Sequence, residues 1–206
     1  MRVHNCFQSI QGEASYAGVP MHFIRLAGCS VRDCFMHPVN TGLCDTDLRT
    51  KYRADPHSLF LGAQSAGLDW VCITGGEPTD QDDLPELVAM LRKNGFKVML
   101  QTAGTRQLWY SVDCLAVAPK TRVAGPSRLQ QVTGHDLKLV YQDTLDPEQL
   151  RGWHNQTHFM NYWLQPEWSR HEEQMPEILE LLSKANRCGA GSWRLSIQQH
   201  KYIGVS

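Results

Sequence analysis

The chain has 206 residues, a formal net charge of −1, and apolar and charged fractions of 42% and 20%. This length suits one domain, and the near-zero charge gives no bulk electrostatic reason to expect binding to nucleic acid or to a membrane surface. The chain contains no run of about 18 apolar residues, and its N-terminal segment lacks the apolar core of a secretory signal. We therefore expect a single cytoplasmic domain over residues 1–206.

Short apolar runs alternate with helical patterns along the chain. The runs predict strands at 22–27, 70–73, 97–101, 114–117, 137–141, 162–165 and 194–198, and the helical patterns predict helices at 58–66, 84–94, 147–153 and 176–187. Segments 122–131 and 151–158 are typical of surface loops. This alternation indicates an α/β fold with a parallel sheet. Because a complete eightfold barrel needs about 250 residues, we expect a partial, open β/α barrel with ligands at the carboxyl ends of its strands.

A cysteine-rich loop follows the first predicted strand. Seven cysteines are present, an odd number that argues against a disulfide framework, and Cys29, Cys34 and Cys44 lie within 16 residues. Thiolates suit iron–sulfur clusters or zinc, and three of them without a nearby fourth favour a cluster with one open iron. His37 would instead complete a Cys3His zinc site. The loop alone leaves both interpretations open.

A glycine-rich turn follows the second predicted strand, with the sequence TGGEP at 74–78. Its two glycines allow a ligand to approach the backbone closely, although a tight strand-to-helix turn would use the same residues. Arg25 lies near the carboxyl end of an otherwise apolar strand. A guanidinium there needs a partner, either an anionic ligand or a structural ion pair.

Together, the cysteine loop and the glycine-rich turn resemble the radical S-adenosylmethionine superfamily. The flanking segments look like those of the 7-carboxy-7-deazaguanine synthase family, and the resemblance runs from Phe7 to the C-terminus. The segments are FQSIQGE at 7–13, FIRLAGC at 23–29, CDT at 44–46, APK at 118–120, DLKL at 136–139, LQP at 164–166 and QHKY at 199–202. The resemblance implies a partial barrel of the radical S-adenosylmethionine type.

The resemblance also implies a lyase reaction and its cofactors. A [4Fe–4S] cluster would reduce S-adenosylmethionine to methionine and a 5′-deoxyadenosyl radical. The radical would take a hydrogen atom from 6-carboxy-5,6,7,8-tetrahydropterin, which loses ammonia and becomes 7-carboxy-7-deazaguanine, a step toward queuosine. Mg²⁺, a homodimer and an electron donor such as flavodoxin or ferredoxin are implied as well. The alternatives are another radical enzyme, such as a glycyl-radical activase, and a non-catalytic zinc module. The SIQGE and QHKY segments argue against the first, and TGGEP has no role in the second.

Site roles follow residue by residue from the resemblance. The cluster ligands are Cys29, Cys34 and Cys44, and the metal-contacting residue for Mg²⁺ is Thr46. The residues for S-adenosylmethionine are Gly75, Gly76, Glu77, Ala118, Pro119, Lys120 and Gln165. The residues for the pterin are Ile10, Gln11, Gly12, Glu13, Arg25, Thr74, His200 and the terminal carboxylate of Ser206.

Two features of the sequence depart from the family pattern. The family loop has CxxxCxxC spacing or ends in CxxC, whereas Thr41 stands here where the partner of Cys44 is expected. Cys34 is the other thiol of the loop and is assigned as a ligand on that ground, with His37 as the alternative. Gln101 and Ala103 stand where the family often has Glu and Asn.

Overall fold

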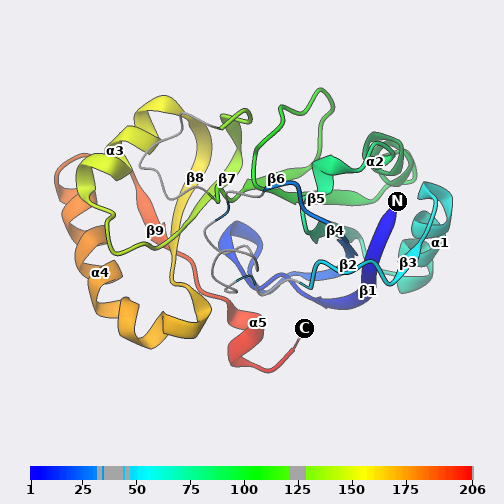
Figure 1. Cartoon of the computed structure of the whole chain (residues 1–206), viewed down its shortest axis with the longest axis horizontal. Helices are drawn as coiled ribbons and strands as arrows, with labels where there is room; N and C mark the ends of the chain where they lie inside the picture. Colours follow the sequence, from blue (N-terminus) through cyan, green and yellow to red (C-terminus); the bar gives the residue numbers. More distant parts are fainter. Residues whose placement is uncertain (32–33, 35–43, 45–46, 121–128, 206) are drawn as a thin grey trace.

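A computed structural model describes residues 1–31, 34, 44, 47–120 and 129–205. Its centre is one nine-stranded sheet in the order β3-β1-β2-β4-β5-β6-β7-β8-β9 (Figure 1). The strands are β1 Arg2–Ile10, β2 Pro20–Leu26, β3 Tyr52–Arg53, β4 Trp70–Gly75, β5 Lys97–Thr102, β6 Cys114–Val117, β7 Thr133–Val140, β8 His158–Gln165 and β9 Trp193–Leu195. The α-helices are α1 Pro56–Ala66, α2 Leu84–Lys93, α3 Pro147–Gln156, α4 His171–Arg187 and α5 Gln199–Tyr202, and the 3₁₀ turns are η1 Ala14–Tyr16, η2 Pro78–Asp80 and η3 Trp168–Arg170.

The sheet is mostly parallel and does not close. Each neighbouring pair from β2 to β9 is parallel, whereas β1 pairs antiparallel with both β2 and β3. Within the described residues β3 and β9 are the edges of the sheet and do not pair with each other. The predicted α/β class and the open, partial barrel are therefore confirmed.

Both faces of the central strands are buried, which explains their continuous apolar runs. Side chains alternate between the faces along each strand. On β4, Val71 and Ile73 pack into the larger core beneath the helices, and Cys72 packs into a smaller cluster on the inner face. Cys114 on β6 joins this inner cluster, and both thiols are fully buried. The apolar sequence runs WVCIT and VDCLAV predict Cys72 and Cys114 as core residues, and the structure confirms this prediction.

The long helices cover the outer face in two pairs. Helices α1 and α2 lie at one end of the sheet and α3 and α4 at the other, while α5 lies apart, near the C-terminus (Figure 1). Local sequence signals define their ends. Asp55 caps α1 by accepting a hydrogen bond from Ser58 N at 2.7 Å, and Asp146 and Gln149 form a capping box at the start of α3.

One predicted loop is wrong, and one strand was not predicted. Residues 151–156 belong to helix α3, because Leu150 and Trp153 bury one helical face although Gly152 and Asn155 are poor helix formers. Strand β1 was not predicted, because polar residues interrupt the alternation of apolar and polar residues along it. Its pairing with β2 is a tertiary contact that the local sequence does not indicate. Across the described ranges, no helix has both the length and the apolar surface needed to cross a membrane.

Candidate active site

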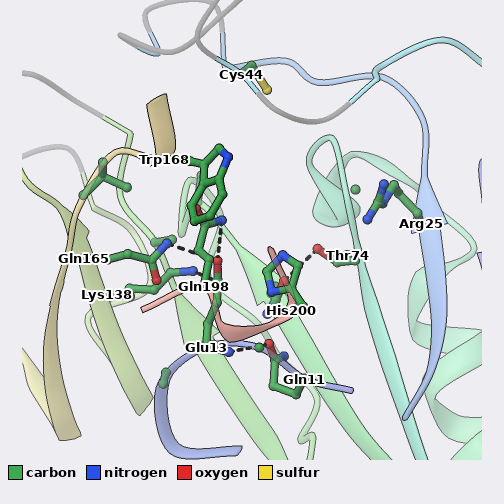
Figure 2. Close-up of a pocket in the computed structure, with 18 of the residues that line it drawn as sticks. Gln11, Glu13, Arg25, Cys44, Thr74, Lys138, Gln165, Trp168, Gln198 and His200 are labelled. Atoms are coloured by element: carbon green, nitrogen blue, oxygen red, sulfur yellow. Dashed lines mark hydrogen bonds and ion pairs between the residues drawn. The ribbon is translucent and has the colours of Figure 1, made fainter. Parts of the chain in front are cut away.

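A cavity of about 380 Å³ opens at the carboxyl ends of the strands, on the inner face of the sheet (Figure 2). Its chemistry follows from side-chain alternation. On β2, Phe23 lies in the inner apolar cluster and Arg25, two residues later, lines the cavity. On β5, Met99 and Gln101 repeat this change from apolar to polar. Each of these strands therefore carries a hydrophobic floor and a polar rim, as ligand sites in such sheets do.

All three candidate cluster ligands line this cavity. None of Cys29, Cys34 and Cys44 forms a disulfide, and Cys29 lies just beyond the end of β2. Burial raises the pKa of the Cys29 thiol, so this cysteine favours the neutral form unless a metal displaces its proton. Thr46, His37, Thr41 and Ser206 fall outside the described residues, and their predicted roles stay predictions.

The donor set, three cysteines at one cavity, has the chemistry of an iron–sulfur site. Among the described residues, no three His, Cys, Asp or Glu side chains converge closely enough to hold one metal ion. A cubane cluster does not need such convergence, because each thiolate binds a different iron at a different corner. Three cysteines around one cavity are the kind of ligand that such a cluster requires.

The glycine-rich turn holds the exit of β2 in place. Gly76 N donates to Leu26 O and Glu77 N donates to Gly28 O, both at 3.0 Å. A Cβ added at Gly76 would lie 1.7 Å from Gly28 O, and one at Gly75 would lie 2.1 Å from Leu26 O. The glycines therefore let two backbones touch, which positions Cys29, and both also line the cavity.

The Glu77 side chain has internal partners and does not belong to the described residues that line the cavity. Its Oε1 accepts from the hydroxyls of Thr79 and Thr102 at 2.6 Å, and its Oε2 accepts from Ala103 N at 2.7 Å. The carboxylate thus ties the exit of β4 to the exit of β5. Its predicted contact with S-adenosylmethionine stays a prediction, and the side chain has a structural role.

Glu13 is the centre of a buried polar network. Its Oε2 pairs with Lys138 Nζ, and its Oε1 accepts from Gln165 Nε2 at 3.1 Å and from Gln198 Nε2 at 2.9 Å. Burial alone would raise the pKa of Glu13, but the Lys138 charge and the three hydrogen bonds outweigh it and hold the pKa below its usual range. The cavity wall therefore carries an ionised carboxylate.

The neighbouring Gln11 directs its amide inward. Its Nε2 lies 3.1 Å from Met99 Sδ, and its Oε1 accepts from Glu13 N at 3.1 Å. Gly12 is packed against His200, since a Cβ there would lie 1.9 Å from His200 Nδ1. Gln199 N also donates to Gly12 O at 2.9 Å. The C-terminal segment is therefore docked on the 10–13 loop, and its docking brings His200 to the cavity.

Arg25 lies across the cavity from Lys138 (Figure 2). Its guanidinium stacks over the Phe7 ring at 5.0 Å from the ring centroid. In the described part of the chain it has no carboxylate partner and no hydrogen bond, so the structural ion pair considered for it does not form there. Thr74 lines the same side and donates to Gln101 Oε1 at 2.8 Å.

The structure thus gathers most of the predicted site in one cavity. Besides the residues described above, Ile10, Ala118 and Lys120 line it, whereas Pro119 does not belong to the described lining residues. Sequence reasoning gave no role to Lys138, Trp168, Gln198 and Gln101, which line it as well. Lys138 carried a usable signal, because it is a charged residue at the carboxyl end of an apolar strand.

The open parallel sheet, the cysteine loop after β2 and the glycine turn after β4 together define a radical S-adenosylmethionine enzyme. The curated 7-carboxy-7-deazaguanine synthase of Bradyrhizobium diazoefficiens is 32% identical over 98% of both chains. That of Escherichia coli K12 is 28% identical over 99% of this chain and 98% of its own. The chain belongs to the 7-carboxy-7-deazaguanine synthase family.

A solved structure agrees with this assignment. The crystal structure of QueE from Escherichia coli matches with a TM-score of 0.71 and 27% identity, over 97% of this chain and 94% of that one. A comparison with protein-family models finds no match.

Proposed function

We propose that the protein is a radical S-adenosylmethionine lyase that converts 6-carboxy-5,6,7,8-tetrahydropterin to 7-carboxy-7-deazaguanine and ammonia. Atoms balance without another reactant, because the product is the substrate less one NH₃, and the conversion is redox-neutral. When bound, the cluster and S-adenosylmethionine would supply the radical that starts the ring contraction. Family membership supports this activity over a zinc module or a glycyl-radical activase.

The observation that best supports the proposal is that Arg25 lacks an anionic partner among the described residues. Its half-buried guanidinium faces the cavity and has no carboxylate partner among the described residues. Such a cation needs an anion, and a guanidinium pairs with a carboxylate through two parallel hydrogen bonds. The 6-carboxylate of the pterin meets that need, with Glu13 on the opposite wall to accept from ring N–H groups.

We assign one part of the cavity to the pterin and the other to the cluster and S-adenosylmethionine. Ile10, Gln11, Gly12, Thr74 and His200 would enclose the pterin between Arg25 and Glu13. Cys29, Cys34 and Cys44 would hold the cluster. The groups near S-adenosylmethionine would be Gly75, Gly76, Ala118, Pro119, Lys120 and Gln165.

The remaining parts of the proposal concern Mg²⁺, the chain end and the assembly. Mg²⁺ would bind between Thr46 and the substrate carboxylate, since Mg²⁺ prefers oxygen ligands and keeps several waters. Ser206 would be a further substrate contact. We further propose a cytoplasmic homodimer, one domain over 1–206, and flavodoxin or ferredoxin as the electron donor.

Anaerobic turnover tests the proposed reaction. Protein purified without oxygen should be brown and hold about four iron and four sulfide per chain. With dithionite, S-adenosylmethionine and the carboxytetrahydropterin, it should release 7-carboxy-7-deazaguanine and ammonia in equal amounts. The 5′-deoxyadenosine released should be less, because the balanced reaction returns the hydrogen atom that the radical removed. A colourless protein with one zinc would overturn the proposal, and 5′-deoxyadenosine without the deazaguanine would indicate another radical reaction.

The Arg25 contact has its own test. Arg25→Gln removes the charge and should raise KM for the pterin about 100-fold, the loss expected for a buried bidentate pair. Arg53→Gln is the matched control, because Arg53 is exposed on β3. If the pterin binds Arg25→Gln as well as it binds the wild type, the proposed role of Arg25 is wrong.

A further inference from the structure

Four segments distant in sequence meet at the Glu13 carboxylate. The loop after β1 supplies Glu13, β7 supplies Lys138, β8 supplies Gln165, and the segment before α5 supplies Gln198. Figure 2 shows these four side chains grouped on one wall of the cavity. The network extends through Ser196, whose hydroxyl donates to Gln165 Oε1 at 2.9 Å.

The Lys138 ammonium stands apart from the other donors in this network because it carries a full charge. The Lys138 and Glu13 side chains are only 11% and 12% exposed, and both line the cavity. Withdrawing two charges from water costs free energy that an ion pair seldom returns as stability. The pair therefore makes more sense as part of a binding surface than as a stabilising device.

The hydrogen-bond capacity of the pair is not exhausted. A carboxylate has about four acceptor positions, and three are taken by Lys138, Gln165 and Gln198. The three contacts also fix the plane of the carboxylate. One acceptor position remains, and both side chains line the space where a ligand would lie. Such an acceptor suits the flat N–H edge of a pterin.

We propose that Lys138 is a positioning residue for substrate binding, which keeps Glu13 ionised and oriented so that its remaining acceptor position receives an N–H group of the pterin ring. This inference rests on the proposed function, because it takes the pterin as the ligand. It assigns Lys138 no contact with the reacting atoms. Because Lys138 acts through Glu13, variants of the two residues can distinguish the contribution of Lys138 from that of Glu13.

In the described part of the chain, few other titratable groups lie near Glu13. Cys72 on β4 lies close enough to interact electrostatically, and burial raises the pKa of its thiol, so it stays neutral. Asp136 precedes Lys138 by two residues on the same face of β7, and His200 on α5 packs against the adjacent Gly12. Within the described residues, Lys138 is the cation paired with Glu13. Without it, burial would favour the protonated carboxyl group.

Binding measured against pH tests the proposal. The probe is 6-carboxypterin, an oxidised analogue that does not turn over, measured by anaerobic equilibrium dialysis against the holoenzyme with S-adenosylmethionine. Lys138→Met should weaken binding about tenfold at about pH 6 and only about twofold at about pH 8.5, relative to the wild type at each pH. The sign follows because Glu13 then takes up a proton as the pH falls and loses its acceptor position.

Two further variants separate positioning from structure. Lys138→Arg retains the charge and should bind within about threefold of the wild type at both pH values. The double variant Glu13→Gln with Lys138→Met leaves no uncompensated charge, and its loss of affinity should not depend on pH. This neutral pair also remains informative if Lys138→Met alone fails to fold.

The outcomes distinguish this inference from the proposed function. A pH-independent loss in Lys138→Met, or an equal loss in Lys138→Arg and Lys138→Met, would show a purely structural lysine and overturn the inference. A wild-type protein that does not bind 6-carboxypterin at any pH, and does not convert the tetrahydropterin, would overturn the proposed function itself.

Discussion

The Thr74 hydroxyl on β4 donates a hydrogen bond to Gln101 Oε1 on β5 at 2.8 Å, and both side chains line the cavity. Because the hydroxyl hydrogen of Thr74 points at Gln101 Oε1, the Thr74 oxygen can accept a hydrogen bond from a ligand. The bond also occupies one of the two lone pairs of the Gln101 carbonyl oxygen. Gln101 thereby sets which hydrogen-bond role Thr74 has.

Removing the Gln101 acceptor should change substrate binding more than catalysis. Gln101→Leu leaves the Thr74 hydroxyl free to rotate, and we expect KM for the pterin to rise about five- to tenfold, the value of one neutral hydrogen bond. Steady-state kinetics checks this. Gln101→Glu is the control, because a carboxylate accepts the same bond and should preserve the orientation of Thr74. A Gln101→Leu variant with unchanged KM would contradict the assignment.

Gly76 should tolerate no side chain. In Gly76→Ala the new Cβ would overlap Gly28 O, so the exit of β2 must move and Cys29 with it. We expect a loss of about 3 kcal/mol in the free energy of unfolding and a clear drop in iron bound per chain. Denaturation and iron analysis measure the two effects.

Gly62→Ala is the matched control for Gly76→Ala. Gly62 lies within α1, and a Cβ added there would meet no described atom within 4 Å outside the backbone of its own helix. Alanine at this position should stabilise the helix by up to about 1 kcal/mol without changing the iron content. Normal iron content in Gly76→Ala would show that the glycine contact does not position Cys29.

The Glu77 carboxylate should matter for stability before it matters for cofactor binding. Glu77→Gln puts amide hydrogens against the Ala103 N–H or the two threonine hydroxyls, and should lower the free energy of unfolding by about 2 kcal/mol. Unfolding of the cluster-free protein measures this. Glu86→Gln, an exposed change in the first turn of α2, serves as the control. Unchanged stability with weakened S-adenosylmethionine binding would mean that Glu77 faces the cofactor instead.

His22 should make the protein sensitive to acid. It is buried on β2, and neither ring nitrogen has a hydrogen-bond partner among the described residues. Burial lowers the pKa of His22, so below the ordinary histidine value of 6.5 the unfolded chain takes up a proton that the folded protein does not. Stability therefore falls as the pH drops through that range.

Replacing His22 should remove this sensitivity. His22→Leu should raise the free energy of unfolding by about 1 kcal/mol at pH 7 and by more at about pH 5.5. Denaturation at both pH values measures the difference. His57→Gln, a change of an exposed histidine on α1, should leave the pH dependence as it is. If lowering the pH reduces the free energy of unfolding equally in His22→Leu and in the wild type, His22 is not the source of the acid sensitivity.

The cysteine assignment predicts which thiols are needed for the cluster. Cys29→Ala, Cys34→Ala and Cys44→Ala should each abolish 5′-deoxyadenosine and deazaguanine formation, with loss of the brown colour. Cys188→Ala should retain both, because Cys188 is exposed at the end of α4. Full activity in Cys34→Ala would transfer the third ligand position to His37.

Much of the fold could be derived from local patterns. Segment 114–117 was predicted with its observed bounds, and 70–73 and 97–101 within two residues, because both faces of these strands are buried and their apolar runs are uninterrupted. Helix α4 begins at His171, five residues before its predicted start at 176, since its first turns are mostly polar and contain Pro176.

The site divides in the same way. Motif residues such as Cys29, Gly76 and Arg25 were identified from the sequence, because each breaks a local rule: a thiol cluster, a paired glycine, a charge in an apolar strand. The partners were not, because the pairings join positions far apart. Lys138 meets Glu13 across 125 residues and Gln198 meets Glu13 across 185. No local pattern records such contacts, since strand order and sheet curvature bring them together.

Local sequence was sufficient for the alternation of strands and helices, the burial of Cys72 and Cys114 and the chemistry of the motifs, because these depend on side-chain period and residue type. The folded chain was needed to show that the Glu77 side chain has internal partners, that Gly76 contacts the backbone at the end of β2, and that Lys138 forms an ion pair with Glu13. Those assignments depend on which strand ends are neighbours at one edge of the sheet, and packing between segments distant in sequence determines this.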